Sequence, residues 1–588
     1  MQTTVADYLK TRLEQLGLEQ MFGVAGNYTA ALLDTILADS DSPITISGNP
    51  NEICAGFAAD AYARYKGIGA VYVTYSVGAF TALNTIAGAY VEHVPIVLIN
   101  GAPTRKETVI ERQEGLLYSH TTGNPMVDIS LFRPVTVAAE RIIDAGQAPY
   151  QIDAALTALL TYQQPVYIEV AEDVWRAACC APERPLRGDR DGRVTVSDTA
   201  AAVAATLELT RQRPRVLFWA GIEIQRQGLE EPFLALMAAL NRDRDDAEQQ
   251  VRFVTSALSK GVVSEDHPLF DGCVTLTEQE IESLTGDDGC LIGIGGWTTS
   301  KNTGSEDVRG SGRVLASAGT ARVGARFFAS VELRDYIEQL TAAVPQCPPA
   351  PLRLPAMLAP VKAAAAVDET ITYDSFFQML SNWLGDDKVL VADAGFPLIG
   401  AQSVHIASQG GFLAQAAWLA IGYSVPAATG VKCALPDKRV VVAVGDGAFH
   451  ETCQAVSDHH HYGHNTVVFV IKNGLYGIEQ FLVNPNPFRQ PPVEYPQRLQ
   501  NAPYAYNALP AWNYEKVVDV FGGKGSKVET LTQLRAALAE IDEFKQSNFV
   551  VEVTVPETSV PGALSRNIDS TVGEDETANP DWPPANKF

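Results

Sequence analysis

A buried strand that ends in an aspartate between two glycines is the feature that most constrains this chain. The stretch is VVAVGDGAFHETCQ, residues 441–454, in which four apolar residues lead into Gly445, Asp446 and Gly447 and a helix-compatible run follows. In α/β proteins, ligands bind beyond the carboxyl ends of the strands. Glycines let backbone N–H groups come close to an anion there, and a helix N-terminus adds favourable partial charge. Because an aspartate would repel a phosphate, the motif predicts a cation between them.

A second polar residue follows the next predicted strand. Asn473, in VIKNGLYG, lies 27 residues after Asp446, which is the length of one helix, a turn and one strand. Adjacent parallel strands would therefore place the two side chains together at one sheet edge. A carboxylate, an amide oxygen and a nearby backbone carbonyl are hard oxygen ligands that suit Mg²⁺. The alternative is that Gly-Asp-Gly is only a turn and Asn473 only a helix cap, but the paired spacing makes this less favoured.

Short Val- and Ile-rich strands alternate with helical patterns along most of the chain, which predicts parallel sheets covered on both faces. Breaks rich in proline and charge separate three such blocks. The predicted fold is therefore α/β, with domains at 1–182, 195–345 and 363–556 and a polar tail at 557–588.

The composition excludes several classes of partner. A chain of 588 residues needs more than one core, and its net charge of −25 argues against nucleic acid or an anionic membrane as a partner. The eight cysteines show no CxxC spacing, which predicts a reduced, cytoplasmic protein. The charged N-terminus is typical of an amphipathic helix and not of a signal peptide, and no clean membrane-spanning segment is predicted.

Asp446 between its glycines, together with Asn473, resembles the thiamin-diphosphate motif. FGVAGNY, NPNEICAGFAADAYARYKG, LLYSHTTGN and GLYGIEQFL extend the likeness over nearly all of the chain. The sequence is similar to the pyruvate/indolepyruvate/phenylpyruvate decarboxylase group of 2-oxo acid decarboxylases. The resemblance implies three doubly wound parallel-sheet domains: pyrimidine-binding, middle and diphosphate-binding.

The resemblance also implies thiamin diphosphate and Mg²⁺ as cofactors. The Mg²⁺ ligands would be Asp446, Asn473 and the carbonyl of Leu475, while Glu52 would hydrogen-bond the pyrimidine ring. On the sequence alone, Glu52 is better explained as a favourable acid in a helix's first turn. Leu419 would offer its carbonyl to the cofactor amine, and Ile421 would lie between the two rings. The remaining implied cofactor contacts are Gly445, Gly447, Ala448 and Ile478. Because such enzymes combine Glu52 of one subunit with the Mg²⁺ site of another, the implied assembly is a homodimer or homotetramer.

Two residues depart from the pattern of these decarboxylases. Asn27 stands where they usually have Asp, and Ser119 stands where they have the first of two histidines, so that His120 remains alone. After CO₂ leaves, the carbon that carried it must be protonated, and neither Asn nor Ser is an efficient proton donor near neutral pH. Glu479 is kept and would share this task with His120, while Trp418, Phe396 and Leu482 would line the substrate pocket.

Two activities are compatible with these departures. The first is decarboxylation of a 2-oxo acid to an aldehyde and CO₂. The second is carboligation, in which slow protonation lets the same carbon attack a second carbonyl and form an acyloin. A catalytically inactive paralogue is a third interpretation, which the joint presence of Glu52, Asp446, Asn473 and Glu479 disfavours.

Overall fold

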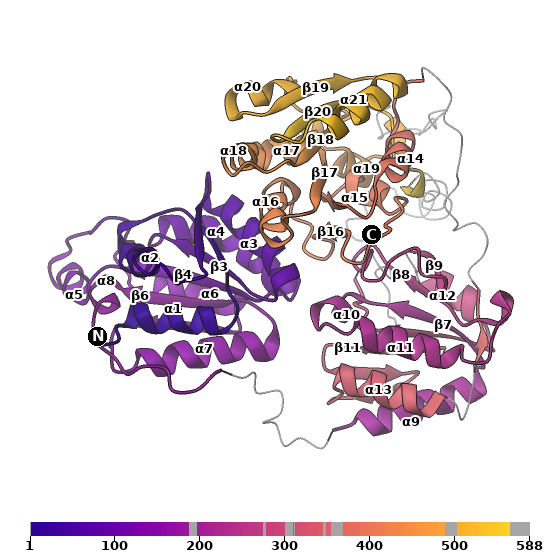
Figure 1. Cartoon of the computed structure of the whole chain (residues 1–588), viewed down its shortest axis with the longest axis horizontal. Helices are drawn as coiled ribbons and strands as arrows, with labels where there is room; N and C mark the ends of the chain where they lie inside the picture. Colours follow the sequence, from indigo (N-terminus) through magenta and orange to yellow (C-terminus); the bar gives the residue numbers. More distant parts are fainter. Residues whose placement is uncertain are drawn as a thin grey trace, which may run out of the picture.

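Three α/β domains, each built on its own sheet, follow one another in the computed structural model (Figure 1). The structure describes residues 2–186, 197–274, 278–299, 310, 312–344, 349–353, 369–488 and 502–564. Most of the proline-rich connector before 363 and of the predicted tail lies outside these residues. Among the described helices, none is both long and apolar enough to cross a bilayer.

The N-terminal domain is a parallel sheet in the order β2-β1-β3-β4-β6-β5. Its central strands β3, β4 and β6 are buried along their whole length because helices cover both faces. The strands are β1 Gln20–Gly23, β2 Thr45–Gly48, β3 Gly69–Val73, β4 Ile96–Ala102, β5 Ala138–Ile142 and β6 Val166–Ala171. The helices are α1 Val5–Gln15, α2 Ala30–Leu37, α3 Glu52–Lys66, α4 Val77–Val91, α5 Arg105–Glu114, α6 Val127–Phe132, α7 Ala148–Tyr162 and α8 Glu172–Trp175.

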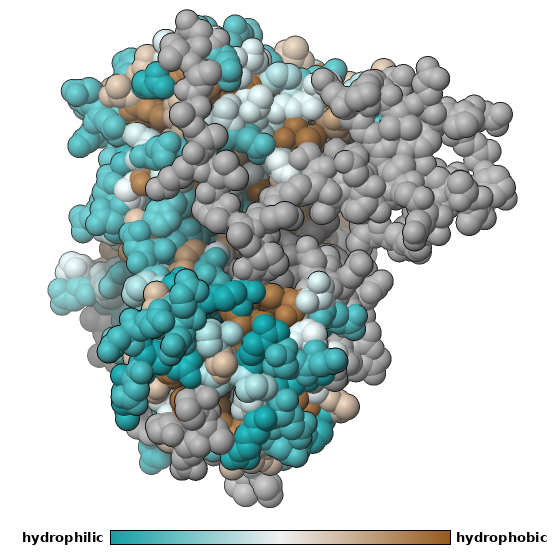
Figure 2. Space-filling view, turned by 90° about the vertical axis from the view of Figure 1, so that its right-hand side faces the viewer, coloured by the Kyte–Doolittle hydropathy of each residue, from teal (hydrophilic) through white to brown (hydrophobic). Residues whose placement is uncertain are grey.

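The middle domain has the sheet order β13-β12-β11-β10-β7-β8-β9, with β14 paired to β7. Its strands are parallel except for β12 and β13, which form an antiparallel edge. The described atoms on the face of this domain seen in Figure 2 are mostly hydrophilic, and their apolar areas are small and separated. The strands are β7 Arg215–Ala220, β8 Phe253–Thr255, β9 Phe270–Cys273, β10 Gly289–Ile294, β11 Arg313–Ser317, β12 Thr320–Val323, β13 Arg326–Phe328 and β14 Ala350–Pro351. The helices are α9 Thr199–Gln212, α10 Ile222–Arg226, α11 Glu230–Leu240, α12 Glu278–Thr285 and α13 Leu333–Ala343.

The C-terminal domain is again a parallel sheet, in the order β16-β15-β17-β18-β20-β19. The predicted fold class is therefore confirmed, with the antiparallel edge of the middle sheet as an addition. The strands are β15 Lys388–Ala392, β16 Phe412–Ala414, β17 Arg439–Gly445, β18 Val467–Lys472, β19 Lys524–Val528 and β20 Phe549–Thr554. The helices are α14 Tyr373–Trp383, α15 Phe396–Ala401, α16 Ser424–Ala434, α17 Asp446–Thr452, α18 Val456–His461, α19 Gly477–Val483, α20 Val518–Phe521 and α21 Leu531–Glu543.

Helices α3 and α16 join the first and third domains through one shared core. Asn51 caps α3 by accepting a hydrogen bond from the N–H of Cys54, and Gly67 ends the helix in the left-handed conformation. Apolar residues of α3, such as Phe57, lie in the same buried cluster as the strands of the C-terminal domain. The two helices approach so closely that a Cβ on Gly430 would lie 1.9 Å from the carbonyl oxygen of Ala58.

We therefore expect Gly430→Ala to separate α3 from α16 and to destabilise the protein by about 2–3 kcal/mol, the usual cost of overpacking. The apparent melting temperature should fall accordingly. Gly48→Ala is the matched control, because a Cβ there meets nothing within 4 Å. Equal melting temperatures for the two variants would show that the helix contact is not tight.

Candidate active site

The ends of β17 and β18 meet at one sheet edge, as the spacing of Asp446 and Asn473 predicts. Gly445, the last residue of β17, pairs in register with Ile471 of β18. Oδ2 of Asp446 accepts a hydrogen bond from the N–H of Gly474 (2.8 Å), and Oδ1 accepts one from the N–H of Gly447 (3.1 Å). The carboxylate thus ties the turn after β18 to the first turn of α17.

The polar side chains at this edge are buried, and protein groups do not supply all the hydrogen bonds that they can form. Burial raises the pKa of Asp446 to about 7, although the backbone N–H groups of Gly474 and Gly447 oppose the shift. Oδ1 of Asn473 accepts from the N–H of Leu475 (3.2 Å), while its Nδ2 is buried without a hydrogen-bond partner among the described residues. A cation beside Asp446 would stabilise its charged form, and an orphaned amide indicates a partner that is not protein. The residues present therefore fit a bound cation with an oxygen-rich ligand.

Gly445, Gly447, Ala448 and Ile478 surround this edge. Gly445 is the N-cap of α17, so the helix begins at Asp446 and the free N–H groups of its first turn face the end of the sheet. Ala448 is buried in the core that the C-terminal domain shares with α3. Ile478 lies in the first turn of α19, half-buried beside Gly395. Such a helix start favours an anion.

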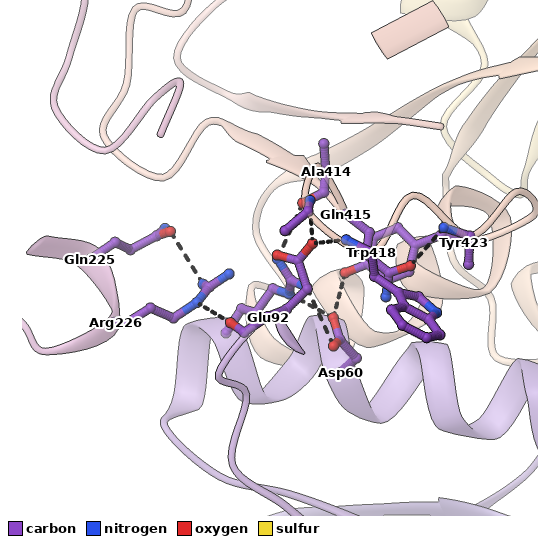
Figure 3. A network of polar contacts seen from close by, with 11 residues as sticks. Asp60, Glu92, Gln225, Arg226, Ala414, Gln415, Trp418 and Tyr423 are labelled. Atoms are coloured by element: carbon purple, nitrogen blue, oxygen red, sulfur yellow. Dashed lines mark hydrogen bonds and ion pairs between the residues drawn. The ribbon is translucent and has the colours of Figure 1, made fainter. Parts of the chain in front are cut away.

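The segment of Leu419 and Ile421 turns sharply. Leu419 has φ of 61°, a left-handed conformation that is costly for a residue with a Cβ. Ahead of the turn, Oε1 of Glu92 accepts from the N–H groups of Ala417 (2.7 Å) and Trp418 (3.0 Å). Glu92 follows α4 of the N-terminal domain, so this contact crosses between domains (Figure 3).

Further polar contacts surround this junction (Figure 3). On α3, Arg64 Nε donates to Asp60 (2.6 Å), and its Nη1 donates to the carbonyl of Ala414 (3.2 Å). The hydroxyl of Tyr423 also donates to Asp60 (2.7 Å). From α10 of the middle domain, Arg226 Nε donates to the carbonyl oxygen of Glu92 (3.4 Å). All three domains thus meet beside the Leu419 turn.

A second buried carboxylate holds the far side of the turn. Asp393, directly after β15, accepts from the N–H groups of Gly422 (3.0 Å) and Ser424 (2.8 Å) and from the Ser424 hydroxyl (2.6 Å). Burial raises the pKa of Asp393 to about 6, and these donors oppose the shift. The strained turn is therefore held at both ends.

Glu52 lies at the first position of α3, with Oε1 2.8 Å from where a Cβ of Gly78 would stand. Burial raises the pKa of its carboxyl. Among the described residues, no hydrogen bond or ion pair joins Glu52 to Asp446 or Asn473. Within the described chain, Glu52 and the end of β17 are therefore not in direct contact.

Asn27, Ser119 and His120 come together near the ends of β1 and β4. The hydroxyl of Tyr28, next to Asn27, donates to the carbonyl of Ser119 (3.1 Å), and its ring meets that of His120 edge-on at 6.4 Å. Ser119 and His120 are exposed in the single chain, as is Glu479 on α19. The structure records no direct contact between His120 and Glu479 among the described residues.

The three expected pocket residues differ in their surroundings. Phe396 is buried among Tyr373, Phe481 and Phe488, with ring-centroid distances of 5.4 to 6.5 Å. Leu482 is half-buried on α19. Trp418 is 38% exposed, and its Nε1 donates to Asn84 on α4 (3.0 Å). Phe396 is thus a packing residue in this chain, whereas Trp418 and Leu482 retain exposed surface.

Comparison with known proteins matches both ends of the chain to one family. The N-terminal thiamine pyrophosphate binding domain of thiamine pyrophosphate enzymes matches residues 3–135, and the C-terminal one matches 393–553, together half of the chain. The chain belongs to the thiamine pyrophosphate enzymes. The resemblance seen in the sequence is confirmed, and thiamin diphosphate is the cofactor of these domains.

Relatives of this thiamine pyrophosphate enzyme match nearly its whole length. An "Alpha-keto-acid decarboxylase" of Mycobacterium leprae is 28% identical over 591 residues, which is 98% of each chain. "Pyruvate decarboxylase isozyme 2" of Saccharomyces cerevisiae is 25% identical over 590 residues, covering 97% of this chain and 98% of the other. The structure of benzoylformate decarboxylase from Polynucleobacter necessarius shares the fold, with a TM-score of 0.72 at 18% identity over 95% of this chain and all of that one.

Sequence reasoning missed the two carboxylates that hold the Leu419 turn of this thiamine pyrophosphate enzyme. The sequence could have indicated Asp393, because KVLVADAG places an acid directly after a buried strand, as in the motif around Asp446. No local pattern indicates Glu92, since it accepts hydrogen bonds from residues 325 and 326 positions later.

The strain at Leu419 leads to a prediction on cofactor affinity. Leu419→Ile keeps the apolar volume but adds a β-branch that the left-handed conformation disfavours. We expect a cost on the order of 1–2 kcal/mol and about tenfold weaker binding of thiamin diphosphate. Leu419→Met, which has no β-branch, is the control. Equal affinities of the two variants in a titration followed by tryptophan fluorescence would contradict the role of this turn.

Proposed function

We propose that this chain is a thiamin-diphosphate- and Mg²⁺-dependent decarboxylase that converts a 2-oxo acid into an aldehyde and CO₂. The observation that carries the proposal is the oxygen-lined edge at Asp446 and Asn473, in a chain whose full-length relatives bear decarboxylase names. Asp446, Asn473 and the carbonyl of Leu475 would hold the Mg²⁺. The backbone of Gly445, Gly447 and Ala448 would face the diphosphate.

The remaining cofactor contacts follow from the turn and from Glu52. The bound cofactor supplies a nucleophilic carbon and a sink for the electrons left behind by CO₂. The carbonyl of Leu419 would accept from the cofactor amine, while Ile421 and Ile478 would pack against its rings. Glu52, whose pKa burial raises, would exchange a proton with the pyrimidine nitrogen.

Assembly into a homodimer, or a homotetramer of two dimers, supports this arrangement. Glu52 has no direct contact with Asp446 within the described chain, and in the assembly implied by the resemblance Glu52 of one copy and Asp446 of another would hold the two ends of one cofactor. Val109, Leu116, Leu117 and Met126 near His120 each expose 42% or more of their surface. A partner subunit would cover these apolar side chains and enclose His120.

Proton delivery to the reacting carbon would fall to His120 and Glu479. The amide of Asn27 and the hydroxyl of Ser119 cannot take over the relay. We infer that aldehyde release is slow. The same observation favours carboligation as the second candidate activity, because a carbon that is protonated slowly has longer to attack another carbonyl.

The decisive experiment measures CO₂ and organic product together. Purified protein with thiamin diphosphate, Mg²⁺ and a panel of 2-oxo acids should release aldehyde and CO₂ one to one. An acyloin containing two substrate skeletons would assign the carboligase activity instead. Absence of CO₂ from every acid would contradict both.

The double variant Asn27→Asp, Ser119→His is the matched comparison. It restores an acid and a second histidine at the two departures, so aldehyde should leave about 10- to 100-fold faster, within the usual range of general acid catalysis. The ratio of aldehyde to acyloin should rise with it. A wild-type protein that releases aldehyde faster than the variant would contradict slow protonation.

Removal of the metal tests the site at Asp446. Treatment with a chelator should abolish turnover, and added Mg²⁺ should restore it in the wild type. Asp446→Asn keeps the shape but removes the charge, so it should need far more Mg²⁺ for the same turnover. Asp458→Asn, at another buried carboxylate outside the site, is the control. Full activity of Asp446→Asn after chelation would exclude this residue as a ligand.

A further inference from the structure

We propose that the hydroxyl of Tyr28 is a positioning group for His120, and that it fixes the imidazole through the backbone carbonyl of Ser119. The inference rests on the proposed function, in which His120 delivers the proton for aldehyde release. Tyr28 would act through His120 and would not itself contact the reacting groups.

Tyr28 is held rigidly on all sides. The residue is 4% exposed, and its own carbonyl accepts a hydrogen bond from the indole Nε1 of Trp175 (2.9 Å). Its backbone passes so close to β4 that a Cβ on Gly101 would lie 2.2 Å from the Tyr28 carbonyl. The ring packs edge-on between those of Tyr75 (6.3 Å) and His120 (6.4 Å). Tyr28 can therefore serve as a fixed reference point for a neighbouring loop.

The loop of Ser119 and His120 has few other attachments. The hydroxyl of Tyr28 donates to the carbonyl of Ser119, and on the other side the Thr121 hydroxyl donates to Glu111 on α5. Between these anchors, Ser119 and His120 are exposed in the chain. Within the loop, the N–H and hydroxyl of Thr121 both donate to the carbonyl of Tyr118 (3.2 Å each), so Tyr28 and Glu111 attach a closed turn to the fold.

The hydrogen bond to Ser119 controls the orientation of the next residue. The carbonyl of Ser119 belongs to the same planar peptide unit as the N–H of His120, so fixing that oxygen fixes the plane about which φ of His120 is set. His120 has φ of 68°, a left-handed conformation that a non-glycine residue keeps only when its surroundings hold it. The turn closed by the hydrogen bond from the N–H of Thr121 to the carbonyl of Tyr118 (3.2 Å) has His120 at its third position, and Tyr28 fixes the carbonyl of Ser119 within that turn.

The charges around Tyr28 keep its hydroxyl protonated. Burial raises the pKa of Tyr28, and the carboxylates of Glu107, Glu172 and Glu111 raise it further, while a hydrogen bond from the side chain of Asn27 opposes the shift. A protonated hydroxyl is the form that can donate to the Ser119 carbonyl. Asn27 also contacts this hydroxyl. The two residues that depart from the decarboxylase pattern, Asn27 and Ser119, therefore both interact with Tyr28.

Tyr28→Phe tests the proposal because it removes the hydroxyl and keeps the ring. In the holoenzyme with Mg²⁺ and the best 2-oxo acid, we expect kcat for aldehyde release to fall about tenfold, with KM within twofold of the wild type. Hydrogen exchange of peptides covering 116–122 should become faster. Tyr75→Phe is the matched control, because it removes a hydroxyl from the same aromatic cluster without a recorded bond to the loop. Its kcat and exchange should match the wild type.

A double-mutant cycle separates positioning from general damage. If Tyr28 acts through His120, Tyr28→Phe should cause no further loss of kcat in a His120→Ala background. The same tenfold loss in both backgrounds, or no loss in either, would overturn the inference. His120→Ala with wild-type kcat would instead overturn the role given to His120 in the proposed function, and the inference with it. Melting temperature and thiamin diphosphate affinity, measured in parallel, should not change with Tyr28→Phe.

Discussion

Buried carboxylates that accept hydrogen bonds from backbone N–H groups determine the shape of this site. Desolvation makes an isolated buried carboxylate costly, so each one must be surrounded by donors or neutralised. Asp393 and Glu92 meet this requirement with pairs of N–H groups on either side of the Leu419 turn. Asp128 does the same for the start of α4 by accepting from the N–H and hydroxyl of Ser76. The loops that carry the site are thus attached to rigid strands and helices by the groups that would otherwise destabilise the core.

Asp446 differs from these carboxylates in what remains unsatisfied around it. It accepts two backbone hydrogen bonds, yet burial still raises its pKa to about 7, and the amide nitrogen of Asn473 beside it has no partner in the described chain. Asp393 receives one more donor, from a hydroxyl, and its pKa rises less, to about 6. The chain therefore supplies more donors to Asp393 than to Asp446, which leaves Asp446 and the Asn473 amide as the pair with room for a further partner.

The parts of the site that are local in sequence could be predicted from it. A strand followed by Gly-Asp-Gly, and an asparagine after the next strand, place Asp446 and Asn473 together because neighbouring parallel strands end at one edge. Contacts between distant segments carry no such signal: Glu92 reaches the N–H of Ala417, 325 positions later, and Tyr28 reaches Ser119, 91 positions later. The sequence left the surroundings of Phe396 open, since an apolar residue after a strand suits a pocket and a core equally well. The structure shows its ring packed among other aromatic rings.

The departures at Asn27 and Ser119 affect the supply of protons more than the position of the loop that carries His120. Replacing an acid by an amide and a histidine by a serine removes two proton donors, but it leaves the loop attached to the fold through Tyr28 and Glu111. In the proposed function, the choice between aldehyde and acyloin would be a competition between proton transfer from His120 and attack on a second carbonyl. A difference of about 1.4 kcal/mol between two barriers changes such a ratio tenfold, which is the scale of one hydrogen bond. Under the proposed function, a small number of polar contacts around His120 would therefore be enough to decide the product, without any change in how the cofactor is held.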